Sequence, residues 1–319
     1  MMSSSTNDPW SMYERMKVVG RGASGSAILC KRKKDNSQVV VKELLHGMKL
    51  KEAHDEYMNE IQLLSIVRHP NIIAYLDSFT HETREQTDTK TRKTEPSLRT
   101  LYIVMEYADG GNIFYMTQGT LDTYLSKLNG NHLEEEKVIY FFSQIAFALH
   151  HIHSHNILHR DLKTNNIMIS ASGKSIVLKI GDFGISKFLN SEETSTNTVV
   201  GTPSYLSPEL CDGKACNEKS DIWAMGCILY EIMALHRMFE GSSLPALVMK
   251  ITAGKYKPLP KIYSEDLSNL VSNCTKLDPQ DRPNTLAIMG LTFLQDGLLN
   301  TQMTIGKLSL EDEIKFSPY

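Results

Sequence analysis

The stretch "HHIHSHNILHRDLKTNN" (residues 150–166) holds five histidines within ten positions and runs into a cluster of charged and amide side chains. Histidine is the commonest metal-binding side chain, and His151 and His155 have the i, i+4 spacing that places two ligands on one helix face. Three interpretations are open at this point. The stretch is a metal site, a helix end rich in histidine, or part of an active site.

The second half of this stretch, "HRDLKTNN" (159–166), combines a base, a cation and an amide. Asp161 can accept the proton of an attacking hydroxyl, Lys163 can neutralise charge on a transferring phosphoryl group, and Asn166 can hold a magnesium ion. The motif "DFG" (182–184) follows and supplies Asp182 for another magnesium ion. Each motif alone can occur by chance in an unrelated sequence, but the order and spacing of the two together predict phosphoryl transfer.

A glycine segment, "GRGASGSA" (20–27), precedes these motifs and has the pattern G-x-G-x-x-G. A dinucleotide fold uses the same spacing but needs a helix after the glycines. Here both flanks are typical of strands, which favours a flap that closes over nucleotide phosphates. A plain glycine hairpin is the alternative.

Lys42 ends a β-rich segment (37–44), and Glu60 lies on the helix that the pattern predicts next. A lysine in this place is commonly an edge residue whose stem packs on the sheet. In the functional interpretation, Lys42 holds the α- and β-phosphates of a nucleotide and Glu60 fixes its ammonium group.

The chain changes character along its length. Residues up to about 105 predict a mostly β lobe with one helix between 50 and 68, whereas the remainder is helical. Residues 1–12 are predicted to be a disordered lead-in, 80–100 a mobile surface loop, and the region from 296 has no clear element. Two core helices are predicted, one over 134–155, with apolar residues at helical spacing, and one over 221–235, apolar nearly all round.

Composition limits the function classes. The net charge of −3 argues against nucleic acid as the main partner. Five scattered cysteines form no disulfide framework, which favours a reducing compartment. The N-terminal residues lack a signal peptide pattern, and the longest apolar stretch, 222–235, is too short for a bilayer. We therefore expect a soluble, cytoplasmic protein without membrane insertion.

The order of these motifs, with "GTPSYLSPEL" (201–210) and "SDIWAMGCILYE" (220–231), resembles the eukaryotic protein kinases over roughly residues 13–295. More narrowly, it resembles the NIMA-related (Nek) serine/threonine kinases. The likeness implies an α+β, bilobal kinase fold, with a β-rich N-lobe over 13–105, a hinge over 106–111, a mostly helical C-lobe over 112–295 and a C-terminal tail over 296–319.

The resemblance also implies a role for each matching residue. Asp161 becomes the catalytic base, with Lys163 and Thr202 beside it, Lys42 and Glu60 the phosphate-positioning pair, and Asn166 and Asp182 the Mg²⁺ ligands. ATP contacts fall on Val19, Gly20, Gly22, Gly25, Ala27, Val40, Lys42, Met105, Glu106, Ala108 and Met168. Thr198 is the expected activating phosphosite, with Thr194, Ser195 and Thr196 as alternatives, and Arg160 is expected to pair with its phosphate. A hydrophobic spine contains Leu64, Tyr75, His159 and Phe183.

Two of these positions carry further expectations. In several Nek kinases a tyrosine at the position of Tyr75 turns into the site and holds an inactive state; simple packing in the spine is the alternative. Ile185, after the DFG motif, favours threonine over serine as the acceptor. The likeness departs from the family at Ser24 and Ala27, where an aromatic residue and a valine are usual, and at an apparent insertion over 112–119.

The implied activity is transfer of the γ-phosphoryl group of ATP to serine or threonine in protein substrates. The segment "LPALVMKI" (244–251) looks like the branch that functions at cilia and often carries RCC1-type repeats, which suggests a partner with such repeats or a ciliary scaffold, and a place at the cytoskeleton, centrosome or cilium. A catalytically silent kinase fold that serves as a scaffold is one alternative, and a metal-binding module is another.

The histidines then divide into two groups. His150, His151, His153 and His155 close the predicted helix, where imidazole interacts favourably with the helix dipole without a metal. His159 belongs to the "HRD" motif and is expected to pack beneath Phe183. A structural ion pair between Glu209 and Arg282 is also predicted.

Overall fold

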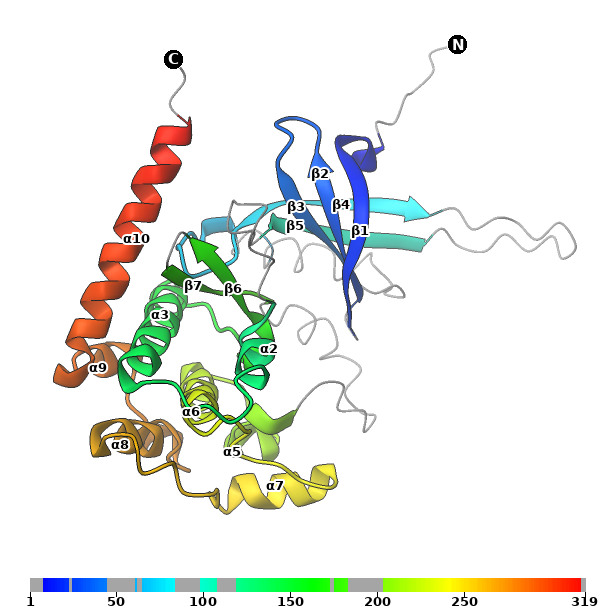
Figure 1. The fold of residues 1–319 in the computed structure, drawn as a ribbon. Helices are drawn as coiled ribbons and strands as arrows, with labels where there is room; N and C mark the ends of the chain where they lie inside the picture. The colour runs from blue at the N-terminus through cyan, green and yellow to red at the C-terminus, as the bar shows by residue number, and fades with distance from the viewer. Residues whose placement is uncertain are drawn as a thin grey trace, which may run out of the picture. The chain divides into compact units, whose positions relative to one another are not determined.

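The computed structural model describes most of the chain, as residues 8–22, 25–44, 61, 65–83, 98–107, 119–172, 175–182 and 203–316. The chain divides into two compact units. The first holds most of the residues up to Tyr107, and the second holds His69–Ile72 and most of the chain from Ala108 onward (Figure 1).

The first unit is built on a five-stranded antiparallel sheet in the order β1-β2-β3-β5-β4. The strands are β1 (Tyr13–Gly22), β2 (Gly25–Arg32), β3 (Gln38–Leu44), β4 (Tyr75–Thr83) and β5 (Leu98–Glu106). In β3, Val39 and Val41 are buried and Val40 and Lys42 are half-buried, which is the alternation of a strand with one face on a core. The predicted β-rich architecture of this part is therefore confirmed.

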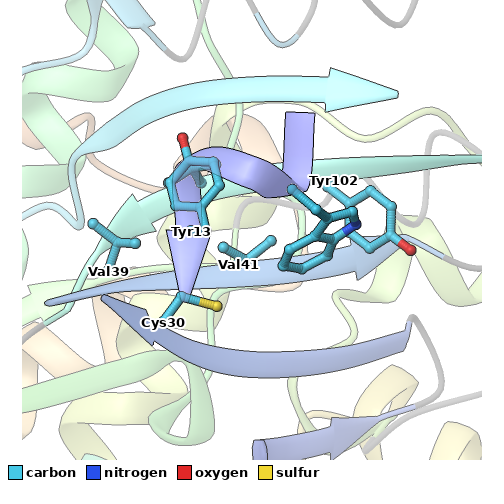
Figure 2. Close-up of a cluster of buried hydrophobic side chains, with 7 residues drawn as sticks. Tyr13, Cys30, Val39, Val41 and Tyr102 are labelled. Atoms are coloured by element: carbon cyan, nitrogen blue, oxygen red, sulfur yellow. The ribbon is translucent and has the colours of Figure 1, made fainter. Parts of the chain in front are cut away.

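One face of this sheet carries the hydrophobic core of the unit. Val39 and Val41, two residues apart on β3, point to the same face as Cys30 and Tyr102 on the neighbouring strands (Figure 2). Trp10 packs on the same cluster, with its ring 4.9 Å from that of Tyr102 in an edge-on contact.

Trp10 corrects an expectation from the sequence. Residues 9–12 belong to the segment predicted to be disordered, but they form a 3-10 helix, η1 (Pro9–Met12), with Trp10 only 8% exposed. The Asp8 side chain caps this helix by accepting a hydrogen bond from the Trp10 N–H at 3.0 Å. Burial of a large aromatic ring stabilises a segment whose polar neighbours suggested none.

The second unit has its core around two long helices. In α3 (Glu135–Ser154), all six residues predicted to form the core face are fully buried: Val138, Phe141, Phe142, Ile145, Leu149 and Ile152. In α6 (Glu218–Ala234), almost every residue from Ser220 on is buried, as its apolar composition predicts. Both core-helix predictions are confirmed.

Shorter elements surround these helices. The helical ones are α2 (Leu121–Ser126), η2 (Thr164–Asn166), η3 (Pro203–Tyr205), α5 (Pro208–Cys211), α7 (Leu244–Thr252), α8 (Glu265–Cys274), η4 (Pro279–Asp281), α9 (Thr285–Met289) and η5 (Thr292–Leu294). A two-stranded hairpin, β6 (Ile167–Ser172) with β7 (Ser175–Ile180), follows η2 directly. No helix in these described ranges combines the length and hydropathy of a membrane span.

The C-terminal region differs from its prediction. The sequence suggests no clear element after residue 296, but α10 (Gln295–Phe316) forms there and lies beside α3 (Figure 1). A Cβ at Gly297 would stand 2.4 Å from Ile139 Cγ2, so the close approach of the two helices depends on glycine. The packing of α10 on α3 stabilises this helix, although its mixed polar sequence did not predict one.

The predicted loop over 80–100 is shorter than expected, because β4 runs to Thr83 and β5 starts at Leu98. Several expectations lie outside the described residues: most of the helix over 50–68, the remainder of the loop, and the insertion over 112–119 except Gly119.

Candidate active site

The catalytic loop places three of the predicted site residues in direct contact. Lys163 Nζ lies 2.7 Å from Asp161 Oδ2, and Asn166 Nδ2 donates to the same oxygen at 2.9 Å. Asn166 Nδ2 also donates to the Asp161 backbone oxygen at 2.8 Å. These charge-assisted contacts fix the orientation of the Asp161 carboxylate, as a general base requires.

The backbone of this loop is held by Asp221, the fourth residue of α6. Asp221 Oδ2 accepts the His159 N–H at 2.9 Å, and Oδ1 accepts the Arg160 N–H at 3.0 Å. Arg160 has a left-handed φ of 65°, a conformation that costs free energy in a non-glycine residue and needs such support. Asp221 belongs to the motif at 220–231, but no local pattern in the sequence predicts this supporting role.

His159 connects the loop to the residues before Asp182. Its Nδ1 accepts the Asp161 N–H at 3.3 Å, which leaves the proton of the neutral ring on Nε2, and Nε2 donates to the Gly181 oxygen at 3.1 Å. The side chain is completely buried, and burial lowers its pKa. His159 is therefore a neutral connecting residue and not a proton acceptor for substrate.

The β6–β7 hairpin brings the two proposed Mg²⁺ ligands together. Asn166 precedes β6, and Asp182 follows β7 by two residues; at the base of the hairpin the Gly181 N–H donates to the Asn166 oxygen at 2.8 Å. The hydrogen bonds of the Asn166 amide run through Nδ2, so they do not use Oδ1, the atom that ligates a cation. Mg²⁺ takes few protein oxygens and completes its shell with water and phosphate, so this donor set fits it.

The sheet of the first unit gathers the predicted nucleotide residues on one face. Ala27 pairs with both Gly20 and Lys42, and Val40 pairs with Met105. Residues directly opposite in an antiparallel pair share a face, as do residues two apart, so these five lie opposite the buried core of Figure 2. Val19 sits at a bulge of β1, and Met168 lies in the second unit on β6.

Gly25 is required by geometry in the glycine segment. Its φ of 126° is in the range that disfavours other residues, and a Cβ there would lie 1.8 Å from the Glu43 carbonyl oxygen. Gly22 and Gly25 pair across the turn between β1 and β2. Glu106, at the end of β5, is held by two hydrogen bonds with the Ala74 backbone, both 2.9 Å long.

The predicted ion pair between Glu209 and Arg282 is present. Both guanidinium Nη atoms donate to the carboxylate at 2.8 Å. Burial alone would raise the pKa of Glu209, but hydrogen bonds from Arg282 and Ser220 bring it down to about 2. Glu209 therefore stays ionised inside the protein.

Three of the four other histidines form hydrogen bonds with different partners, whereas Nε2 of His151 is buried and has no hydrogen-bond partner. His153 Nε2 lies 2.9 Å from Asp221 Oδ2, His150 Nδ1 lies 3.0 Å from Thr285 Oγ1, and His155 Nδ1 lies 2.8 Å from the His151 carbonyl in the last turn of α3. The described part of the chain contains no group of three or more His, Cys, Asp or Glu residues placed to hold a metal ion.

Several predicted residues lie outside the described part of the chain: Glu60, Leu64, Ala108, Phe183, Ile185, Thr198 and Thr202. The structure adds residues around the catalytic loop that the sequence analysis did not identify. Tyr205 and Thr164 hydrogen-bond each other at 2.8 Å, and both bond the buried carboxylate of Glu231. No local pattern indicates this contact, because Thr164 and Glu231 are 67 positions apart.

Comparison with known proteins agrees with this site. The family model for the protein kinase domain matches residues 13–294. The chain is 42% identical over 298 residues to the serine/threonine-protein kinase Nek8 of Danio rerio, covering 93% of this chain and 39% of that protein. It is 39% identical over 299 residues to the serine/threonine-protein kinase nekl-2 of Caenorhabditis elegans, covering 93% of this chain and 78% of that protein.

A third relative is the probable serine/threonine-protein kinase nek3 of Dictyostelium discoideum, which is 44% identical over 288 residues, or 90% of this chain and 24% of that protein. The chain thus spans well under two thirds of the length of two of these three relatives. The matched kinase region, the extent of these similarities and the catalytic loop geometry lead to one conclusion. The chain belongs to the protein kinase family and, within it, to the NIMA-related (Nek) serine/threonine kinases.

Proposed function

We propose that this chain is a serine/threonine protein kinase that transfers the γ-phosphoryl group of ATP to protein substrates. The observation that carries the proposal is the fixed Asp161 carboxylate. Lys163 and Asn166 contact it, and Asp221 accepts two hydrogen bonds from the backbone of the same loop. An oriented carboxylate beside a cation is the arrangement that phosphoryl transfer to a hydroxyl needs.

In the proposed reaction, Asp161 accepts the proton of the substrate hydroxyl. The oxygen of that hydroxyl forms a bond to the γ-phosphorus of ATP, and the bond from this phosphorus to the leaving ADP breaks. Lys163, 2.7 Å from Asp161, stabilises the charge that develops on the transferred group. Asn166 and Asp182 would hold Mg²⁺, which would supply positive charge to neutralise the phosphates. Lys42 would hold the α- and β-phosphates, with Glu60 and Thr202 in the roles that the family likeness implies.

The deciding experiment is a Mg²⁺-dependent assay with ATP and a generic protein substrate, comparing wild type with Asp161→Asn. We expect the variant to lose a factor of roughly 10² to 10⁴ in rate while it keeps its unfolding midpoint, since the general base contributes about that much. A wild type as inactive as Asp161→Asn would instead favour the silent scaffold.

Finer aspects of the function are proposed on the family likeness. They are activation by phosphorylation near Thr198, a preference for threonine through Ile185, and a place in the cytoplasm at the cytoskeleton, centrosome or cilium with an RCC1-repeat or ciliary scaffold partner. Support for the place comes from the segment 244–251, which resembles the cilia-associated branch of the family. Imaging the tagged chain against centrosomal and axonemal markers tests it, and a uniform distribution would contradict it.

A further inference from the structure

A cluster of three charged side chains adjoins the catalytic loop and has no part in the reaction described above. Arg237 follows the end of α6, where Leu235 in the left-handed conformation turns the chain back. Arg237 Nη2 donates to Asp122 Oδ1 at 2.7 Å and to Asn165 Oδ1 at 3.3 Å. Its Nε lies 3.8 Å from Glu231 Oε1. One guanidinium therefore serves two carboxylates that come from different elements.

The burial of these groups makes the positive charge of Arg237 important. The side chain of Glu231 is 7% exposed, whereas those of Arg237 and Asp122 are 20% and 33% exposed. Burial raises the pKa of Glu231, and the Tyr205 hydroxyl and the Arg237 charge act in the opposite direction. Without Arg237, the two carboxylates would face each other with no cation between them, and a cation from outside would be attracted.

The guanidinium itself is incompletely satisfied. Arg237 Nη1 is buried and has no hydrogen-bond partner, although its Cζ lies 5.1 Å from the centre of the Tyr205 ring. A buried donor without a partner costs free energy. The position of Arg237 is thus set mainly by its electrostatic attraction to Asp122 and Glu231, and not by a complete set of hydrogen bonds.

The cluster adjoins the path of a substrate. Asn165 and Thr164 contact Arg237 and Glu231, while their chain neighbours Lys163 and Asn166 contact Asp161. A peptide whose hydroxyl reaches Asp161 must run along this loop, so a side chain near its acceptor residue comes close to the cluster. The partial exposure of Asp122 leaves the cluster open to such a side chain.

We propose that Arg237 is a specificity-determining residue, which neutralises Asp122 and Glu231 beside the catalytic loop and so prevents the selection of basic side chains at the substrate position that faces them. This inference rests on the proposed kinase function. It predicts that Asp122 and Glu231 can bind arginine or lysine of a peptide once Arg237 is replaced.

The first test is a positional peptide library in which arginine, lysine or alanine stands at each position around the acceptor. We expect wild type to show no preference for a basic residue at the position concerned. Arg237→Ala and Arg237→Met should each prefer arginine over alanine at one position by at least about tenfold, the scale of a charged hydrogen bond. Arg237→Met keeps a long apolar side chain at this position, so its profile stays informative where the alanine variant folds poorly.

Two controls separate local recognition from a general change in charge. Lys214→Ala removes an equally charged side chain that pairs with Asp212 on the surface, and it should leave the profile as in wild type. Adding Asp122→Asn to Arg237→Met removes one of the two carboxylates that lost their cation. The double variant should therefore lose most of the preference for arginine. Equal profiles for wild type, Arg237→Ala and Arg237→Met would overturn the proposal, as would a gain of the same size in Lys214→Ala.

A second test does not depend on catalysis. Calorimetric titration with ethylguanidinium should show millimolar binding to Arg237→Ala and no binding to wild type or to the Arg237→Ala/Asp122→Asn variant. Absence of binding to Arg237→Ala, in protein with a normal circular dichroism spectrum, would overturn the proposal. If wild type phosphorylates neither peptides nor a generic protein, the proposed function fails, and this titration still decides whether Arg237 fills a site for a basic group.

Discussion

Arg282 and Glu209 form a bidentate ion pair in the interior of the second unit, with two N–O distances of 2.8 Å. Arg282 is 1% exposed and also donates to the backbone oxygens of Lys276, Lys219 and Leu277. The pair therefore joins α5, which begins six residues after Thr202, to α6 and to the segment after α8.

Removing the cation of this pair should destabilise the protein strongly. Arg282→Met leaves the Glu209 carboxylate buried without a cation, a change that costs about 3–5 kcal/mol of unfolding free energy. Urea denaturation at pH 7 measures it. Adding Glu209→Gln to Arg282→Met should restore part of the loss, and an equal loss in the single and double variants would contradict the role of the buried charge.

Gly25 and Gly20 offer a matched pair of substitutions in the glycine segment. Gly25→Ala should cost at least about 2 kcal/mol of stability and raise the KM for ATP, because its Cβ would meet the Glu43 oxygen at 1.8 Å in a strained conformation. Gly20→Ala is the control, since the nearest atom to its Cβ is Ala27 Cβ at 3.8 Å. Thermal unfolding and ATP titration check both, and equal effects would argue against the steric explanation.

His69 should make stability depend on pH. Burial, with smaller contributions from His151 and Lys179, lowers its pKa from 6.5 to about 4. The neutral Nδ1 accepts the Asn71 N–H at 3.1 Å, a bond that protonation breaks, and the His151 ring lies 5.2 Å away. Because the pKa is lower in the folded state, this contribution to stability is complete above pH 6.5 and is lost as the pH falls toward 4.

Between pH 7 and pH 4, we expect the free energy of unfolding to fall by about 3 kcal/mol because of His69. Urea denaturation of wild type and His69→Gln at several pH values in this range gives the free energy of unfolding of each. The contribution of His69 is the difference between the two proteins in how steeply this free energy falls with pH. If both proteins lose stability in parallel as the pH falls, His69 does not carry the effect.

Thr198 should control activity through Arg160, whose guanidinium is expected to pair with a phosphate in the family arrangement. We expect purified active protein to carry phosphate near Thr198 by mass spectrometry, and Thr198→Ala to lower the rate by at least about tenfold. Thr194→Ala, Ser195→Ala and Thr196→Ala test the alternative phosphosites in the same assay. Full activity of Thr198→Ala in protein without phosphate there would show that the idea is wrong.

Tyr75 provides a test of an inactive state. It is half-buried and pairs with Met105, so it lies on the sheet face that carries Val40 and Lys42. If its ring holds an inactive state, Tyr75→Ala should raise basal phosphorylation about three- to tenfold by shifting the population toward the active state. Tyr75→Phe keeps the ring and should change little; a loss of activity in Tyr75→Ala, with no gain in any phosphorylation state, would favour simple packing.

The sequence alone determined the elements whose signals are local. Helical spacing identified the buried face of α3, the apolar composition of 221–235 identified α6, and motif order identified the catalytic loop and the glycine segment. It also predicted the pair of Glu209 with Arg282. The periodicity of burial and the chemistry of a motif are properties of neighbouring residues, so both can be read before the chain folds.

Only the tertiary structure decided which distant side chains meet. The burial of Trp10, the packing of α10 on α3 at Gly297, and the support of the catalytic loop by Asp221 each depend on elements far apart in the chain. Arg237 and Asp122 are separated by 115 positions, and neither belongs to a motif with a local signal. Such contacts arise from the packing of helices and strands against one another, which fixes distances that the residue pattern along the chain does not specify.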